Sequence, residues 1–279
     1  MSQKTNASLF RRILKTSEWN SKYIEQNKEE SSLFLYKDIE IRNYLDRVLG
    51  LNDFLIMTCK TELSYSKLTV FISVLDNSLV QKPVETGQGS SSFIGRKNLI
   101  TKVINSTVIT VLKKYFGYTS NVLIKTKYLN KQFENNILKS KSSQLEYNKL
   151  VKRLKVFRNY PNSPEIIKMA LIVITNKNSA SLLAKSLSCL ISNQKRRHSY
   201  ILTFIKKLFT ILLASRISRI YGLRILVSGR LNGFPRAKKR LLKIGSVPLQ
   251  SFSSHVDYFQ DVTYTSNGTF GIKVWICGK

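Results

Sequence analysis

The chain has 279 residues, of which 43% are hydrophobic, and it contains 14 Phe and 13 Tyr. This length suits two modest domains, and so many apolar side chains exclude a disordered basic tail. The formal net charge of +30 favours a protein with a permanent acidic partner over a generally basic soluble protein, because such a surface repels itself until an acidic partner neutralises it. We therefore expect a permanent polyanionic partner, and nucleic acid is the commonest one.

The positive charge rises toward the C-terminus. Residues 1–50 carry nine basic and seven acidic groups, whereas residues 178–279 carry seventeen and two. No Asp or Glu occurs between Glu165 and Asp257. The sequence therefore predicts that the C-terminal part makes the densest contact with the polyanion.

Metal, disulfide and membrane chemistry have little support in the sequence. The three cysteines, Cys59, Cys189 and Cys277, are far apart, and only His198 and His255 are available beside them. Without a C-x-x-C pair, neither a disulfide framework nor a metal site is predicted, and no cofactor is expected. Lys or Arg interrupts every apolar run before it reaches about 20 residues, so we expect no membrane span.

The N-terminal part alternates helical and strand-like patterns. Residues 1–50 are expected to form an arm that ends in a helix, because Ile41, Tyr44, Leu45 and Val48 follow the i, i+3, i+4, i+7 spacing. Residues 54–58 and 68–74 are rich in β-branched and aromatic side chains and predict a hairpin. Residues 75–92 are expected to form a long, inserted loop.

A short basic motif, residues 93–98, stands before a helical run at residues 99–112. A backbone that turns at Gly95 and then begins a helix can direct amide N–H groups and the side chains of Arg96 and Lys97 at a phosphate. An RNA-binding loop of the KH type needs G-x-x-G, and Asn98 takes the place of the second glycine. We therefore expect a degenerate KH domain over residues 51–177, although an ordinary turn at Gly95 also fits.

Two apolar runs compete for the closing strand of that domain. One is residues 122–124 and the other is residues 170–174, and periodicity alone does not choose between them. Between them, residues 131–168 are rich in Lys, Asn and Ser. This composition favours a solvated, inserted loop over a specific RNA-binding element.

Residues 178–279 are expected to form the C-terminal domain. Helices are predicted at residues 182–191 and 200–215, strands at 223–227, 262–265 and 272–276, and a basic helix at 235–244. On that last helix Arg236, Lys239, Arg240 and Lys243 would share one side, which suits a row of phosphates. The candidates for RNA contact in this domain are Lys195, Arg196, Arg197, Lys206, Lys207, Arg230, Arg236, Lys238, Lys239, Arg240 and Lys243.

Four separated blocks of the C-terminal domain resemble one known family. The blocks are residues 222–233, 245–249, 257–258 and 268–276, and together they resemble the C-terminal domain of ribosomal protein S3 of the small subunit. Upstream, residues 19–23, 41–45 and 93–97 resemble landmarks of that family's N-terminal arm and KH domain. The resemblance implies an α+β chain in which a divergent type II KH domain precedes a C-terminal α/β domain with a mixed sheet. The chain departs from the family pattern at Asn98, at the two insertions and at Phe234-Pro235.

The resemblance implies a structural constituent of the small-subunit head. Such a protein would bind ribosomal RNA and neighbouring head proteins, and would help to line the channel by which mRNA enters. Arg196, Arg197, Lys206 and Lys207 lie nearest to the channel-facing helix of the family. The alternative is a free KH-type regulator of organelle mRNA. An enzyme is not expected, because no spacing brings the few carboxylates and histidines of the basic half together.

The amino-acid composition indicates the compartment, because it reflects the base composition of the genome that encodes the chain. Lys, Asn, Ile, Tyr, Phe and Ser are used heavily, which is typical of AT-rich organelle genomes. Because residues near Gln3-Lys4 already resemble the family, we expect an organelle-encoded protein without a cleaved leader. The insertions and the lost loop glycine favour a mitochondrial ribosome, with a plastid as the alternative.

Overall fold

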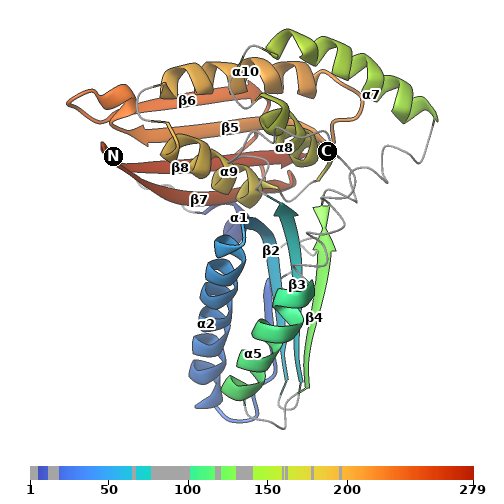
Figure 1. Cartoon of the computed structure of the whole chain (residues 1–279), viewed down its shortest axis with the longest axis vertical. Coiled ribbons are helices and arrows are strands. Elements are labelled where there is room, and N and C mark those ends of the chain that lie inside the picture. The colour runs from blue at the N-terminus through green and yellow to red at the C-terminus, as the bar shows by residue number, and fades with distance from the viewer. Residues whose placement is uncertain are drawn as a thin grey trace. The chain divides into compact units, whose positions relative to one another are not determined.

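The chain divides into two compact units, which we describe separately. The computed structural model describes residues 6–11, 19–64, 67–76, 101–116, 121–129, 141–158, 160, 163–176, 179–194 and 197–279 (Figure 1). One unit is Trp19–Leu129, and the other combines Met1–Glu18 with Asn130–Lys279. The domain boundary that we expected at residue 177 is therefore wrong. Residues 163–175 form a helix that packs with two later helices of the second unit, so they belong with the C-terminal sheet.

The N-terminal unit is built on a mixed four-stranded sheet. Its strands are β1 (Ser21–Tyr23), β2 (Phe54–Leu63), β3 (Lys67–Asp76) and β4 (Asn121–Tyr128), in the order β1-β2-β3-β4. β2 and β3 form the expected antiparallel hairpin, while β1 and β4 run parallel to β2 and β3 respectively. The closing strand is therefore the one at residues 121–128.

Two helical segments cover this sheet (Figure 1). They are α2 (Glu30–Leu51) and α5 (Ile109–Phe116), the second of which follows a π-helical turn, η1 (Ile104–Val108). Ile41 and Leu45 of α2 are buried in one core cluster with Val70 and Ile72 of β3, as the helical spacing predicted. The motif Gly95-Arg96-Lys97-Asn98 lies outside the described residues, so the KH assignment stays a prediction.

The apolar run at residues 170–174 is not a strand. It forms the centre of α8 (Ser163–Thr175), and its side chains from Ala170 to Ile174 are all buried. A helix that is buried on every side shows no polar face, and so a short run of it looks the same as a buried strand.

The expected solvated loop at residues 131–168 is also wrong where the structure describes it. Residues 141–154 form α7 (Lys141–Leu154), which continues into a 3-10 turn, η2 (Lys155–Phe157). Leu150, Leu154 and Phe157 are buried. The Phe157 ring lies 5.4 Å from that of Phe204, centroid to centroid, so aromatic contacts join this segment to the helix that carries Phe204.

The C-terminal unit contains a second four-stranded sheet. Its strands are β5 (Ile220–Gly229), β6 (Lys238–Gly245), β7 (Val256–Thr265) and β8 (Gly268–Gly278), in the order β6-β5-β8-β7. All adjacent pairs are antiparallel, so the mixed sheet that we expected here is found in the N-terminal unit instead. The expected helices are present as α9 (Ala180–Ser192) and α10 (His198–Leu213).

Helices cover one face of the C-terminal sheet, and the opposite face is covered differently. Helix α9 packs on β7 and β8, and α10 packs on β6 and β5, over the face that carries the buried Ile225 and Val274. We call the opposite side the outer face. One end of the outer face is covered by the N-terminal helix α1 (Ala7–Phe10), where Ala7 packs with Val256 and Cys277.

The basic helix that we expected at residues 235–244 is wrong, because residues 238–245 form β6. Leu242 and Ile244 are buried while Leu241 and Lys243 are exposed, which is the alternation of a strand. β6 lies at the sheet edge and carries cations on both faces, so the contrast between polar and apolar sides that would reveal a strand is weak.

Candidate nucleic-acid interface

The turn between β5 and β6 is bonded to the start of α10. Asn232 in this turn has a φ of 57°, and its side-chain oxygen accepts a hydrogen bond from the Ser199 amide at 3.2 Å. Its side-chain nitrogen donates to Ser199 Oγ at 3.0 Å. The Asn232 amide also donates to His198 Nδ1 at 3.1 Å. The Gly-rich turn therefore fixes the position of the α10 N-terminus.

This arrangement brings together cations that are distant in sequence. Arg197 immediately precedes α10, while Arg230, Arg236 and Lys238 lie on or beside the turn, and all four are exposed. We call these four residues the basic corner. Arg230 Nε donates to the Phe234 carbonyl at 3.1 Å, and the Lys238 ammonium lies 4.6 Å from the centre of the Phe234 ring. Phe234, where the chain departs from the family pattern, thus contacts two of the four cations of the basic corner.

Helix α10 presents two more predicted cations to solvent. Lys206 and Lys207 are exposed, while Ile205 and Leu208 on either side of them in sequence are buried. The helix thus has an apolar side that packs on the sheet and a cationic side. These two lysines occupy the solvent side, as the sequence predicted.

The cations of β6 do not share one side as we expected. In the register with β5, Arg240 pairs with the buried Val227 and Lys238 with Gly229, so both belong to the helix-covered face. Lys243 pairs with Arg224, which places it on the outer face, and Lys239 follows the same alternation. The strand therefore directs its cations to two different surfaces.

The outer face also holds two cations that sequence reasoning missed. Arg224 of β5 pairs with Trp275 of β8, and its guanidinium carbon lies 5.3 Å from the Trp275 ring centre. Lys273 of β8 pairs with Leu226. Each interrupts an apolar strand at an alternating position, and this period-two pattern is the signal that would have found them.

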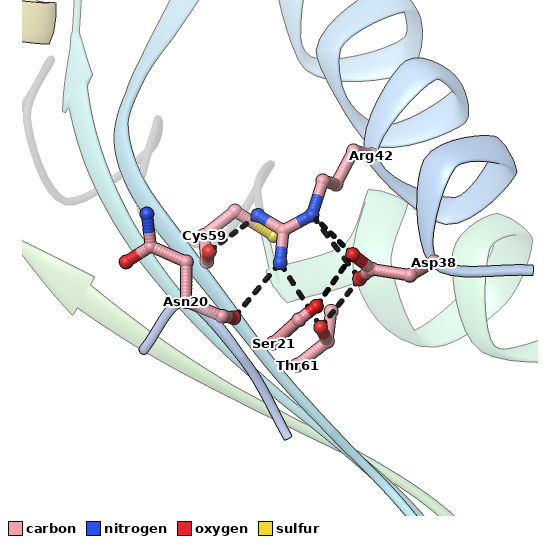
Figure 2. A network of polar contacts seen from close by, with 6 residues as sticks. All are labelled: Asn20, Ser21, Asp38, Arg42, Cys59 and Thr61. Atoms are coloured by element: carbon pink, nitrogen blue, oxygen red, sulfur yellow. Dashed lines mark hydrogen bonds and ion pairs between the residues drawn. The ribbon is translucent and has the colours of Figure 1, made fainter. Parts of the chain in front are cut away.

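One arginine of a family-like landmark, Arg42, is part of the fold. Figure 2 shows its guanidinium surrounded by acceptors from α2, β2 and the segment before β1. Its Nε donates to Asp38 at 3.0 Å, and its two terminal nitrogens donate to the Cys59 carbonyl at 2.6 Å and to the Asn20 carbonyl at 2.8 Å. With so many internal partners, Arg42 is not a candidate for RNA contact.

The same network holds the Asp38 carboxylate in its charged form. Burial of this group acts to raise its pKa, but hydrogen bonds from Arg42, Thr61 and Ser21, together with the charge of Arg42, outweigh burial. The pKa of Asp38 is consequently below its ordinary value of 3.8.

A second arginine, Arg11, is also internal. It is 6% exposed, and its guanidinium donates to the backbone oxygens of Leu249 at 2.9 Å and Ser251 at 2.8 Å. Arg11 therefore joins the N-terminal segment to the loop after β6 and is not part of a basic surface.

Five predicted RNA-contact residues lie outside the described part of the chain: Gly95, Arg96, Lys97, Lys195 and Arg196. Within the described residues, no group of three or more His, Cys, Asp or Glu side chains could hold a metal ion. No helix among them is long and apolar enough to cross a membrane.

Comparison with known proteins identifies the C-terminal sheet. The family described as ribosomal protein S3, C-terminal domain, matches residues 203–276, from the middle of α10 to near the end of β8. Over these residues the chain is similar to the C-terminal domain of ribosomal protein S3. The resemblance to ribosomal protein S3 that the sequence predicted is therefore confirmed for this domain.

Individual S3 relatives align with only part of this chain. The small ribosomal subunit protein uS3c of Euglena gracilis is 34% identical over 115 residues, which are 41% of this chain and 50% of that protein. The uS3c protein of Cyanidium caldarium is 34% identical over 119 residues, or 43% of this chain and 55% of that protein. The uS3 protein of Karelsulcia muelleri is 37% identical over 98 residues, which are 35% of this chain and 40% of that protein. The chain thus spans about half the length of these curated relatives.

Proposed function

We propose that this chain is a structural constituent of the small ribosomal subunit of an organelle and binds its ribosomal RNA without a catalytic step. The observation that carries the proposal is the position of the cations on the S3-type C-terminal unit. The sequence from Ile166 to Val256 has no carboxylate, and the exposed basic corner and the exposed lysines of α10 lie within it. Such a surface is stable only against a polyanion.

The finer roles follow from the surfaces that carry these cations. Arg197, Lys206 and Lys207 lie along α10 on its solvent side and are the residues that we propose to contact mRNA where it enters the subunit. Arg230, Arg236, Lys238 and Arg240 are proposed to contact ribosomal RNA, because they lie on or near the fixed turn between β5 and β6. The remaining exposed surface would contact neighbouring proteins of the subunit head.

The N-terminal unit is proposed to be a divergent KH domain. Its helix, hairpin, helix and closing strand leave the segment with Gly95, Arg96 and Lys97 between β3 and the helix that ends in α5. A phosphate would bind there at a helix start. Lys195 and Arg196, next to the basic corner in sequence, are proposed to extend that corner.

The compartment is proposed from composition and relatives. Two relatives carry the chloroplast-type name uS3c, which supports an organelle. We propose a mitochondrion because of Asn98 and the inserted segments, with a plastid as the alternative. Fractionation of mitochondria and plastids, followed by immunoblotting for this chain, decides between them.

Recovery of bound RNA tests the proposed function. A tagged chain is purified from organelle lysate, and the RNA that copurifies is sequenced. We expect small-subunit ribosomal RNA to be enriched to the level found with an authentic small-subunit protein. Enrichment of particular mRNAs without ribosomal RNA would overturn the proposal and support a free KH-type regulator.

A further inference from the structure

The outer face of the C-terminal sheet carries a band of cations across three strands. Register places Arg224 of β5 between Lys243 of β6 and Trp275 of β8, and places Leu226 of β5 between Leu241 and Lys273. Lys239 lies on the same face of β6, four residues before Lys243. With strands about 4.8 Å apart and about 3.4 Å per residue, the band is about 10 Å wide and about 14 Å long. We call Arg224, Lys239, Lys243 and Lys273 the outer-face cations.

No carboxylate of the sheet opposes these cations. The two acidic residues of the C-terminal sheet, Asp257 and Asp261, both belong to β7. Asp257 pairs with Ile276 and Asp261 with Ile272, and both isoleucines are fully buried on the helix-covered face. Asp257 also accepts a hydrogen bond from the Ala180 amide of α9 at 2.8 Å. Both acidic side chains are therefore directed away from the outer face.

Protection of the sheet edge explains only part of this band. Lysines on an edge strand prevent other strands from pairing with it, and this accounts for Lys239 and Lys243 on β6. Arg224 and Lys273 are on β5 and β8, the two central strands, which have neighbours on both sides. Cations on central strands need another reason, because they do nothing to protect an edge.

Other segments of the C-terminal unit cover one end of the outer face. Val256, Trp275 and Cys277 are buried there against Ala7, Val247 and Leu249. Away from this covered end, Leu241, which pairs with Leu226, is 50% exposed, and Val262, which pairs with Gly271, is 46% exposed. The face therefore combines a fixed apolar end with an open, cationic part.

We propose that the outer face is an RNA-backbone site, at which the four outer-face cations contact phosphates of the ribosomal RNA. An acidic protein would match the charge as well, but the band has few apolar groups to bury, whereas phosphate contacts need only cations at intervals on an accessible surface. The site is separate from the lysines of α10, a helix that packs on the opposite face of the sheet, and from the basic corner, which lies at the turn between β5 and β6 and at the start of α10. This inference rests on the proposed function, since it names one surface by which the chain binds RNA.

Salt-dependent RNA binding tests the site. The full chain and a Lys243→Gln/Lys273→Gln variant are titrated with a fluorescent 20-nucleotide oligouridylate at several salt concentrations. Loss of two phosphate contacts is expected to reduce the slope of log affinity against log salt by about 1.4, at about 0.7 per contact on a single strand. The matched control is Lys113→Gln/Lys114→Gln on α5, which loses the same charge from exposed positions in the other unit and should keep the slope.

Folding and charge are controlled separately. Circular dichroism melting compares each variant with the unchanged chain. Lys243→Gln alone, at an exposed position on the edge strand, should reduce the slope by about 0.7 even if Lys273→Gln perturbs packing. Lys273→Arg keeps the charge and should keep the slope. An unchanged slope in the folded double variant, or an equal fall in the α5 control, would overturn the site.

Incorporation into subunits separates this inference from the proposed function. If the unchanged chain enters small subunits and the double variant has a normal slope, the outer-face site is wrong and the ribosomal function stands. If the variant has a normal slope but no longer enters subunits, the face binds a protein partner, which also overturns the RNA site. If the unchanged chain fails to enter subunits, the proposed function itself fails.

Discussion

Asn232 and Ser199 are joined by two hydrogen bonds, one to the Ser199 amide at 3.2 Å and one to its hydroxyl at 3.0 Å. The two residues are 33 positions apart, one in the turn after β5 and the other in the first turn of α10. Because Arg230 precedes Asn232 in the turn and Arg197 precedes α10, this contact sets the relative position of cations from two parts of the sequence. Helix capping by a distant side chain thus organises the basic corner.

Replacing Asn232 tests this cap. Asn232→Gly keeps the positive φ of 57° without strain but removes both side-chain hydrogen bonds. We expect the free energy of unfolding to fall by about 1–2 kcal/mol, as for a lost N-terminal cap, measured by urea denaturation. In the double variant with Ser199→Ala the two losses should be less than additive. Full additivity would mean that the two side chains do not act together.

Asp38 should stabilise the N-terminal unit at neutral pH and lose that effect in acid. Its pKa in the fold is below the ordinary 3.8, so its contribution is complete above about pH 4 and disappears as the pH falls through the lowered pKa. Asp38→Ala leaves the buried part of the Arg42 guanidinium without its carboxylate, and we expect a loss of about 3 kcal/mol at pH 7. Urea denaturation at pH 7 and pH 3 should show the two proteins converging at the lower pH. A gap of the same size at both pH values would contradict the network in Figure 2.

Asp257 should behave in the opposite way. Burial raises the pKa of this carboxyl, against the Ala180 amide, His255 and the Tyr258 amide, which lower it. A raised pKa means that stability is complete below the ordinary value of 3.8 and is lost as the pH rises through the pKa in the fold. Asp257→Asn keeps an acceptor for the Ala180 amide without the charge, so at pH 7 it should be at least as stable as the unchanged chain. Asp257→Ala removes the acceptor and should cost about 1 kcal/mol.

The measurement for Asp257 is urea denaturation of both variants from pH 7 to pH 4. The advantage of Asp257→Asn should shrink as the pH falls, because the unchanged carboxyl becomes protonated. A clear loss of stability in Asp257→Asn at pH 7 would show that the charge itself is needed there.

Gly222 should tolerate no side chain. It pairs with Gly245 across β5 and β6, and a Cβ on Gly222 would lie 2.3 Å from the backbone oxygen of Ser246. Gly222→Ala therefore has to displace backbone, and we expect a loss of at least about 2 kcal/mol in urea denaturation. The control is Gly50→Ala in α2, where nothing lies within 4 Å of the new Cβ and helix propensity should add about 0.5–1 kcal/mol. Equal stabilities of the two variants would contradict the close approach of the strands.

Elements with one clear apolar side could be predicted from the sequence. Helices α2, α9 and α10 each bury one stripe of side chains, and the hairpin of β2 and β3 is rich in β-branched residues. Strand β6 could not be predicted, because its cations point to both faces and Pro235 before it is equally typical of a helix start. Helix α8 was missed because residues 169–174 within it are buried all round, and the segment of α7 and η2 was missed because Phe157 of η2 packs on Phe204, about 50 residues later.

The candidate interface was predictable to a similar degree. Runs of basic residues marked Arg197, Lys206 and Lys207, and the block at residues 222–233 marked Arg230. The structure places all four at the surface. Arg224 and Lys273 are single cations inside apolar strands, and the sequence did not predict them as RNA contacts. The strand register identifies them, because it places Arg224 beside Lys243 and Lys273 beside Leu226. A strand residue faces one side of the sheet or the other according to its register with neighbouring strands. Those strands are distant in sequence, so a local sequence pattern does not reveal the side.

Sedimentation of organelle ribosomes tests the central claim, that this chain is a resident protein of the small subunit. Lysate is separated on a sucrose gradient at low magnesium, where the subunits are apart, and each fraction is probed for this chain and for small-subunit ribosomal RNA. We expect the chain to comigrate quantitatively with the small-subunit peak and to stay there after a moderate salt wash. A chain found mainly at the top of the gradient, free of that RNA, would contradict the account.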